Sequence, residues 1–113
     1  MYARSSKWLE DIRDAAAFIG QVTHGRTLDA YSADRLLRQA VERNFEIIGE
    51  AIKRLAQHDP DTAVRIAQYA QIIAFRNVLI HGYELVDHSL VWSTVQTQLP
   101  VLLRDVAAIL ASD

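Results

Sequence analysis

Apolar residues recur at helical intervals along most of the chain. The first such series has alternating spacings of four and three residues and consists of Trp8, Ile12, Ala15, Ile19 and Val22. Residues at these spacings share one face of a helix, so the pattern predicts a first helix that packs one side on a core. Ser5 or Ser6 is suited to cap its start, and Gly25 to end it. Thr27 or Ser32 then begins the next element.

A longer helical pattern extends from Ala33 to about Gln57. Its apolar side carries Leu37, Val41, Phe45, Ile48, Ile52 and Leu55. From Arg35 to Arg54 the polar sides hold five basic residues against three acidic ones. The basic excess has two interpretations. Either the helix forms the positive rim of a phosphate-binding groove, or it exposes a solvated face of ion pairs four residues apart, such as Arg38 with Glu42 and Glu50 with Arg54.

The clearest break in the helical pattern is the sequence His-Asp-Pro-Asp at positions 58–61. Pro60 disfavours the helical conformation in the residue before it. Asp61 or Thr62 is suited to cap a short helix over Ala63 to Ala67. The next predicted helix extends from about Gln68 to His81, and its apolar side carries Tyr69, Ile72, Ile73 and Leu79.

The last helical stretch follows a loop over Glu84 to Val86, and Asp87 is its predicted cap. Its apolar series is Trp92, Val95, Leu99, Leu102, Val106 and Ile109. Pro100 falls inside this series and predicts a kink or a junction between two helices. No alternation with a period of two, bounded by turn residues, occurs anywhere. We therefore expect an all-α fold, an up-and-down bundle of four or five helices, with residues 1–113 forming a single domain.

Composition limits the classes of function. With 50% hydrophobic and 23% charged residues, the chain has the composition of an ordinary globular domain. No apolar run approaches the roughly 20 residues that cross a membrane, and no secretory signal is recognisable, so we expect a cytoplasmic protein. The absence of cysteine excludes disulfides and thiolate ligands, and the four histidines have no zinc-like spacing, so no metal or cofactor is expected. A net charge of −2 argues against a protein that coats nucleic acid generally, although an enzyme with a local basic cleft remains compatible.

Chemically capable side chains are concentrated between positions 75 and 83. Arg76 lies inside an apolar stripe, where a guanidinium needs a carboxylate or an anionic ligand. Asn77 shares a helical face with His81, whereas Arg76 lies about 140° around the helix from His81. A site that uses both therefore needs a long reach by Arg76, a loosened helix end, or a second copy of the chain. Gly82 is a plausible helix stop that would leave Tyr83 accessible.

Two residues of the preceding helix bear on Arg76. A glycine inside a helix, such as Gly49, costs about 1 kcal/mol relative to alanine, which a close approach by another backbone would offset. That approach is expected within the chain, with an approach across a dimer interface as the alternative. Glu50, its neighbour, is the candidate anion for Arg76.

The motif Arg76, four residues, His81-Gly82-Tyr83 resembles the signature of the HepT family of HEPN-domain ribonuclease toxins. The segments 47–51, 86–87, 91–92 and 99–100 resemble parts of that family in the same order. The resemblance implies a homodimeric, metal-independent endoribonuclease that acts on RNA, with tRNA as the favoured substrate. It also implies a partner, an MntA-like minimal nucleotidyltransferase antitoxin, that neutralises the toxin by attaching AMP to Tyr83.

Through this resemblance each motif residue receives a role. His81 is general base or acid, because imidazole exchanges protons near neutral pH. Arg76 stabilises the charge on the phosphate, and Asn77 orients one of the two, with Glu50 in support. RNA cleavage needs both a general acid and a general base, and one histidine and one arginine per chain are too few for both. We therefore expect a homodimer that brings two copies of the motif to one site.

Two other interpretations stay open. In one, the chain is a non-catalytic HEPN-like helical module that binds a nucleotidyltransferase partner and nucleotide, and Arg76 and His81 grip phosphate without cutting RNA. In the other, it is a structural bundle, and His81 only caps a helix end. Four aromatic residues are assigned to core or interface, although one that lies near the groove could stack a base: Trp8, Tyr31, Tyr69 and Trp92.

Overall fold

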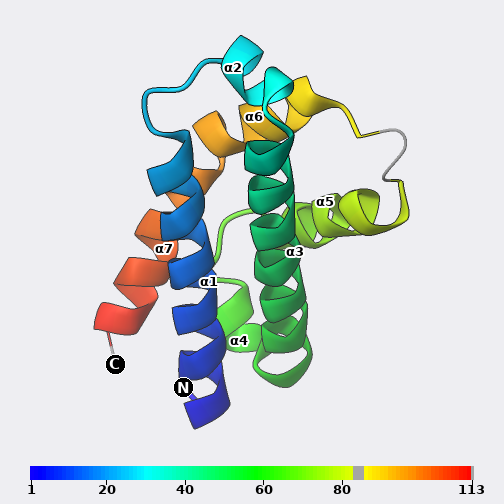
Figure 1. The fold of residues 1–113 in the computed structure, drawn as a ribbon. Coiled ribbons are helices and arrows are strands. Elements are labelled where there is room, and N and C mark those ends of the chain that lie inside the picture. The colour runs from blue at the N-terminus through cyan, green and yellow to red at the C-terminus, as the bar shows by residue number, and fades with distance from the viewer. Residues whose placement is uncertain (83–85, 113) are drawn as a thin grey trace.

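The computed structural model describes residues 1–82 and 86–112, and their regular structure is entirely helical (Figure 1). The helices are α1 (Ala3–Thr23), α2 (Leu28–Ala33), α3 (Arg35–His58), α4 (Pro60–Ala63), α5 (Tyr69–His81), α6 (His88–Thr97) and α7 (Leu99–Ala111). The long helix α1 packs against α3 on one side and against α7 on another, while α5 packs on α3. In Figure 1, α5 extends sideways from α3, away from α1 and α7. The all-α class predicted from the sequence is confirmed.

The core is built from the apolar stripes of α1, α3 and α7. Its fully buried side chains include Leu9, Ile12, Ile19, Val41, Ile48, Ile52, Leu55 and Val106. The stripe predicted for α1 is displaced at its start, because Leu9 is fully buried there while Trp8 is only partly buried at the edge of the core.

Two of the predicted helix caps are wrong for a common reason. α1 begins at Ala3, so Ser5 lies inside it; the buried Ser5 hydroxyl donates to Asp59 Oδ2 at 2.6 Å. Asp59 itself is the cap of α4, where it accepts from the Thr62 amide and hydroxyl at 3.3 and 2.7 Å. The short helix therefore occupies Pro60–Ala63 instead of 63–67, with Pro60 in its first turn.

Three other boundaries follow the predictions. Thr27 caps α2 by accepting from the Ala30 amide. Asp87 caps α6 by accepting from the Ser89 amide. The last helical stretch is divided into α6 and α7, and Pro100 lies in the first turn of α7.

Helix α5 carries the motif and is only partly covered. It follows Gln68, which has a left-handed φ of 57°, and ends at Gly82, whose amide donates to the Val78 carbonyl at 2.8 Å. Within α5 only Ile72 and Leu79 are buried, while Val78 is 49% exposed. The motif helix thus presents apolar surface to the outside. None of the described helices is long and apolar enough to cross a membrane.

Candidate functional site

The crossing of α3 and α5 places Gly49 against Arg76. A Cβ atom at position 49 would lie 2.3 Å from Arg76 Cβ and 2.7 Å from its Cγ, closer than two carbon atoms can approach. The missing side chain therefore lets the Arg76 stem lie directly on the backbone of α3. The close approach predicted for Gly49 occurs within the chain, but the approaching group is a side chain instead of a second backbone.

The Arg76 guanidinium is held by two side chains. Its Nη2 lies 2.8 Å from Glu50 Oε2, the anion expected from the sequence, and its Nη1 donates to Asn77 Oδ1 at 3.1 Å. Its Nε is buried and has no hydrogen-bond partner among the described residues. With a side chain that is 19% exposed, Arg76 is anchored in the protein yet still accessible at its tip.

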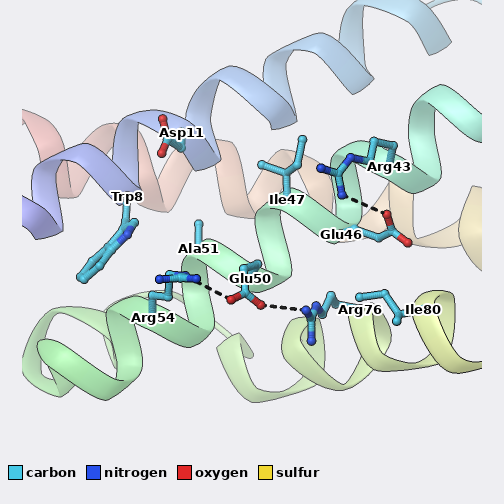
Figure 2. Close-up of a pocket in the computed structure, with 10 residues that line it drawn as sticks. All are labelled: Trp8, Asp11, Arg43, Glu46, Ile47, Glu50, Ala51, Arg54, Arg76 and Ile80. Atoms are coloured by element: carbon cyan, nitrogen blue, oxygen red, sulfur yellow. Dashed lines mark hydrogen bonds and ion pairs between the residues drawn. The ribbon is translucent and has the colours of Figure 1, made fainter.

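Arg76 borders an open cavity of about 350 Å³ (Figure 2). Helix α3 forms its floor, and α1 and α5 form its two sides. We call it the central trough, and its lining residues are Trp8, Asp11, Arg43, Glu46, Ile47, Glu50, Ala51, Arg54, Arg76 and Ile80. Glu50 is shared in the trough, because its Oε1 also accepts from Arg54 Nε at 3.1 Å. The Glu50 carboxylate thus forms ion pairs with two guanidinium groups, those of Arg54 and Arg76.

Of the two interpretations of the charges on α3, the ion pairs are confirmed in part, and the phosphate-binding rim stays a prediction. Ion pairs join Glu50 to Arg54 and Arg43 to Glu46, the latter at 3.4 Å. Arg38 instead donates to the Ser32 carbonyl. Among the described residues that line the trough, these pairs leave little positive excess, and the group of Arg54, Glu50 and Arg76 carries it.

His81 is the last residue of α5 and is exposed. It does not line the central trough, although Arg76 and Ile80 do. This separation agrees with the angle of about 140° between positions five apart on a helix. Within the described residues, the trough that Arg76 borders therefore does not include His81. Tyr83, the predicted modification site, lies outside the described residues.

The structure brings together a second set of polar side chains, which the sequence does not connect with one another. The Tyr31 hydroxyl and His88 Nδ1 are buried with no hydrogen-bond partner among the described residues. Burial raises the pKa of Tyr31, and the negative charge of Glu42 adds to this effect. Burial likewise raises the pKa of Glu42, while His88 and Arg38 oppose the change. Sequence spacing gives no signal for this group, because its members come from α2, α3 and α6. No three histidine or acidic side chains of the described part are placed to hold a metal ion.

Comparison with known proteins identifies the family of this sequence. The family model described as Ribonuclease HepT-like matches residues 12–109. A protein named as a candidate RNase, from Caldanaerobacter subterraneus subsp. tengcongensis, is 29% identical over 94% of each chain. A protein named Probable ribonuclease HepT, from Thermococcus cleftensis, is 34% identical over 88% of this chain and 90% of its own. No solved structure gives a significant match. The match across most of the chain shows that this protein belongs to the HepT-like ribonuclease family.

Proposed function

We propose that this protein is the toxin of a toxin-antitoxin system, a metal-independent endoribonuclease that cleaves RNA in the cytoplasm, with tRNA as the favoured substrate. Family membership supports RNA cleavage in general. The observation that carries the assignment to particular residues is the anchoring of Arg76. Its guanidinium is fixed by Glu50 and Asn77 at the edge of an open trough. A cation fixed before the substrate arrives stabilises developing charge without reorganisation.

In the proposed reaction His81 takes the proton of the ribose 2′-hydroxyl, and the 2′-oxygen attacks the adjacent phosphorus. The bond from phosphorus to the 5′-oxygen breaks, and that oxygen receives a proton from a second imidazole. The products are a 2′,3′-cyclic phosphate and a 5′-hydroxyl. Arg76 stabilises the charge on the non-bridging oxygens, which suits a guanidinium because it donates two parallel hydrogen bonds. Asn77 keeps that guanidinium oriented through its 3.1 Å contact.

A second copy of the chain supplies the second imidazole in this proposal. Among the described residues, His81 does not line the trough that Arg76 borders, so a homodimer is the simplest way to bring both kinds of group to one phosphodiester. The surface that fits this role is the outer side of α5, where Val78 is 49% exposed. That side adjoins the motif, so two copies meeting there would unite two motifs.

Regulation by a nucleotidyltransferase antitoxin completes the proposal. The antitoxin, of the minimal MntA-like kind, transfers AMP to Tyr83, two positions after His81. The added phosphate and nucleotide would exclude RNA by charge repulsion and by volume. Intact mass of the protein, purified with and without its neighbouring gene product, tests this part. A mass increase of one AMP that Tyr83→Phe abolishes is the expected result.

The nuclease is tested by incubating the purified, unmodified protein with total tRNA in EDTA. We expect cleavage by the wild type and a loss of at least 100-fold in Arg76→Ala and in His81→Ala, in line with the loss of a charge stabiliser or a proton-transfer group. Exposed Arg104, which lies outside the motif and the trough, provides the matched control Arg104→Ala with wild-type activity. Equal cleavage by the wild type and both motif variants would disprove the assignment.

One observation favours a second candidate function. Glu50 and Asn77 hold the Arg76 guanidinium in one orientation. A guanidinium held in this way can bind a phosphate group as a fixed cation without taking part in cleavage. The chain would then be a non-catalytic HEPN-like module that binds a nucleotidyltransferase partner and nucleotide. Unmodified wild-type protein that binds nucleotide but leaves RNA intact would support this function over the nuclease.

A further inference from the structure

Trp8 occupies an unusual position beside the candidate site. It is only partly buried, and its ring packs at 5.3 Å against the His58 ring. The residue lines two cavities, the central trough and a second one of about 340 Å³ beside Tyr2, Arg4 and His58. In Figure 2 the indole stands at the same end of the trough as Arg54, while Arg76 lies toward the other end. An accessible indole in a polar cavity is a stacking platform for a planar ligand.

The charges around this platform favour an anionic ligand. Asp11 is neutralised by Lys7, whose Nζ lies 2.7 Å away, and Glu46 is neutralised by Arg43. Glu50 must serve both Arg54 and Arg76, at 3.1 and 2.8 Å. Among residues 1–82 and 86–112, one positive charge therefore remains without a counterion, on the guanidinium pair that extends from the Trp8 end of the trough to Arg76.

We propose that the central trough holds one unpaired nucleotide next to the scissile phosphodiester, with its base stacked on Trp8 and its phosphate bound between Arg54 and Arg76. This inference rests on the proposed nuclease function and names its substrate class. A base can cover the indole only when its own face is free, and both faces are covered by neighbouring bases inside a double helix. The enzyme therefore selects single-stranded segments. Stacking tolerates every base, so the trough adds affinity without strong sequence preference.

Fluorescence provides a direct test, because the chain has two tryptophans. Trp92→Phe leaves Trp8 as the sole indole, and Trp8→Phe leaves Trp92, which packs against Tyr31 away from the trough. The probe is a short single-stranded oligonucleotide with 2′-O-methyl riboses, which lacks the nucleophile for cleavage. We expect saturable quenching in Trp92→Phe, little quenching by a duplex of the same sequence, and no saturable quenching in Trp8→Phe. Trp8 emission that is indifferent to the single strand would overturn the proposal.

Affinity gives a second readout. Trp8→Ala should weaken binding of the single strand about 5- to 150-fold, the range for loss of one stacked base, while Trp8→Phe keeps most of the affinity. In cleavage of single-stranded RNA the same loss should appear in KM more than in kcat. Thermal unfolding of each variant checks that the fold is kept, and the quenching of Trp8 in Trp92→Phe still decides the proposal if Trp8→Ala unfolds.

The two proposals fail in different ways. Wild-type cleavage that Trp8→Ala leaves unchanged in KM, together with unchanged binding of the oligonucleotide, would overturn the stacking site and leave the nuclease intact. Quenching of Trp8 by the oligonucleotide in a protein that cleaves no RNA would support the stacking site and reject the nuclease.

Discussion

Where α3 and α5 cross, the absence of a side chain at Gly49 makes room for the aliphatic stem of Arg76. The Arg76 stem occupies the volume that a side chain at position 49 would need, and this contact puts the guanidinium beside Glu50. The helix cost of about 1 kcal/mol for a glycine is thereby offset by a contact that positions a candidate catalytic group. At position 49 the contact with α5 therefore outweighs the low helix propensity of glycine.

Gly49→Ala should destabilise the protein by about 1–3 kcal/mol, because the added methyl group forces Arg76 out of its place. Gly20 in α1 is the matched control, since a Cβ atom there would meet nothing within 4 Å. Gly20→Ala should stabilise the protein by up to about 1 kcal/mol. Urea unfolding measures both changes. If the two alanines have the same effect, the packing argument at position 49 is wrong.

Some residue contacts could be predicted from sequence and others could not. The pairing of Arg76 with Glu50 was predictable, because a guanidinium in an apolar stripe needs an anion and Glu50 lies on the neighbouring helix. The prediction that Ser5 caps the first helix is wrong. Its hydroxyl binds Asp59, 54 positions away, and capping rules consider only neighbouring residues. For Trp8 the sequence predicts core or interface and leaves base stacking as an alternative, because helical spacing does not show that its ring borders a cavity.

At the scale of elements, a buried polar contact joins α1 to the start of α4. Asp59 accepts from Ser5 of α1 and from Thr62 of α4, and it is 6% exposed. The hydrogen bonds from Ser5 and Thr62 lower the pKa of Asp59 below its usual value of 3.8. This contact fixes the loop after α3 to the N-terminal turn of the chain.

Asp59→Asn should lower the free energy of unfolding at neutral pH by about 1.5–3 kcal/mol, the usual contribution of hydrogen bonds to a charged group. A carboxyl whose pKa is lower in the folded state stabilises the fold above its unfolded pKa, and this contribution is lost as pH falls through the folded pKa. The difference between wild type and variant should therefore be full above about pH 5 and disappear in stronger acid. Denaturant unfolding at several pH values measures it. A difference that is independent of pH would show that the Asp59 charge does not stabilise the junction.

The boundaries of elements were predictable where the signal is local. Asp87 and Thr27 cap helices through amides two or three positions away, and Pro100 marks a new helix by its own geometry. The helix predicted over 63–67 is misplaced because its cap is Asp59, immediately before Pro60, and neither Asp61 nor Thr62. Cap rules name several candidates, and burial of Asp59 against Ser5 decides between them.

At the scale of the whole molecule, α5 stands apart from the packed body of α1, α3 and α7. It packs on α3 (Figure 1). Val78, between Arg76 and His81 in the sequence of α5, is exposed. The all-α class followed from periodicity alone. The arrangement that makes the central trough did not, because it depends on how α1 and α5 flank α3, which no single helix encodes.

Val78→Asp should convert the proposed dimer to a monomer and abolish RNA cleavage, because a desolvated carboxylate at an apolar interface is costly. Since Val78 is 49% exposed in one chain, stability of the monomer should change by only about 0.5 kcal/mol. Leu36→Asp is the matched control at a site that is 80% exposed on α3, and it should leave both assembly and cleavage unchanged. Sedimentation measures the assembly of the wild type and both variants, and the tRNA assay measures their cleavage rates. A monomeric Val78→Asp protein that cleaves at the wild-type rate would refute the shared site.

The division of Glu50 between Arg54 and Arg76 has a consequence for catalysis. In the proposed nuclease, Glu50 would compete with the RNA phosphodiester for the guanidinium groups of Arg54 and Arg76. Glu50→Gln should therefore tighten binding of uncleaved RNA and also slow turnover, because Arg76 gains availability while losing its fixed orientation. Measured KM and kcat should both decrease, whereas a variant unchanged in both would show that this carboxylate exerts no such restraint.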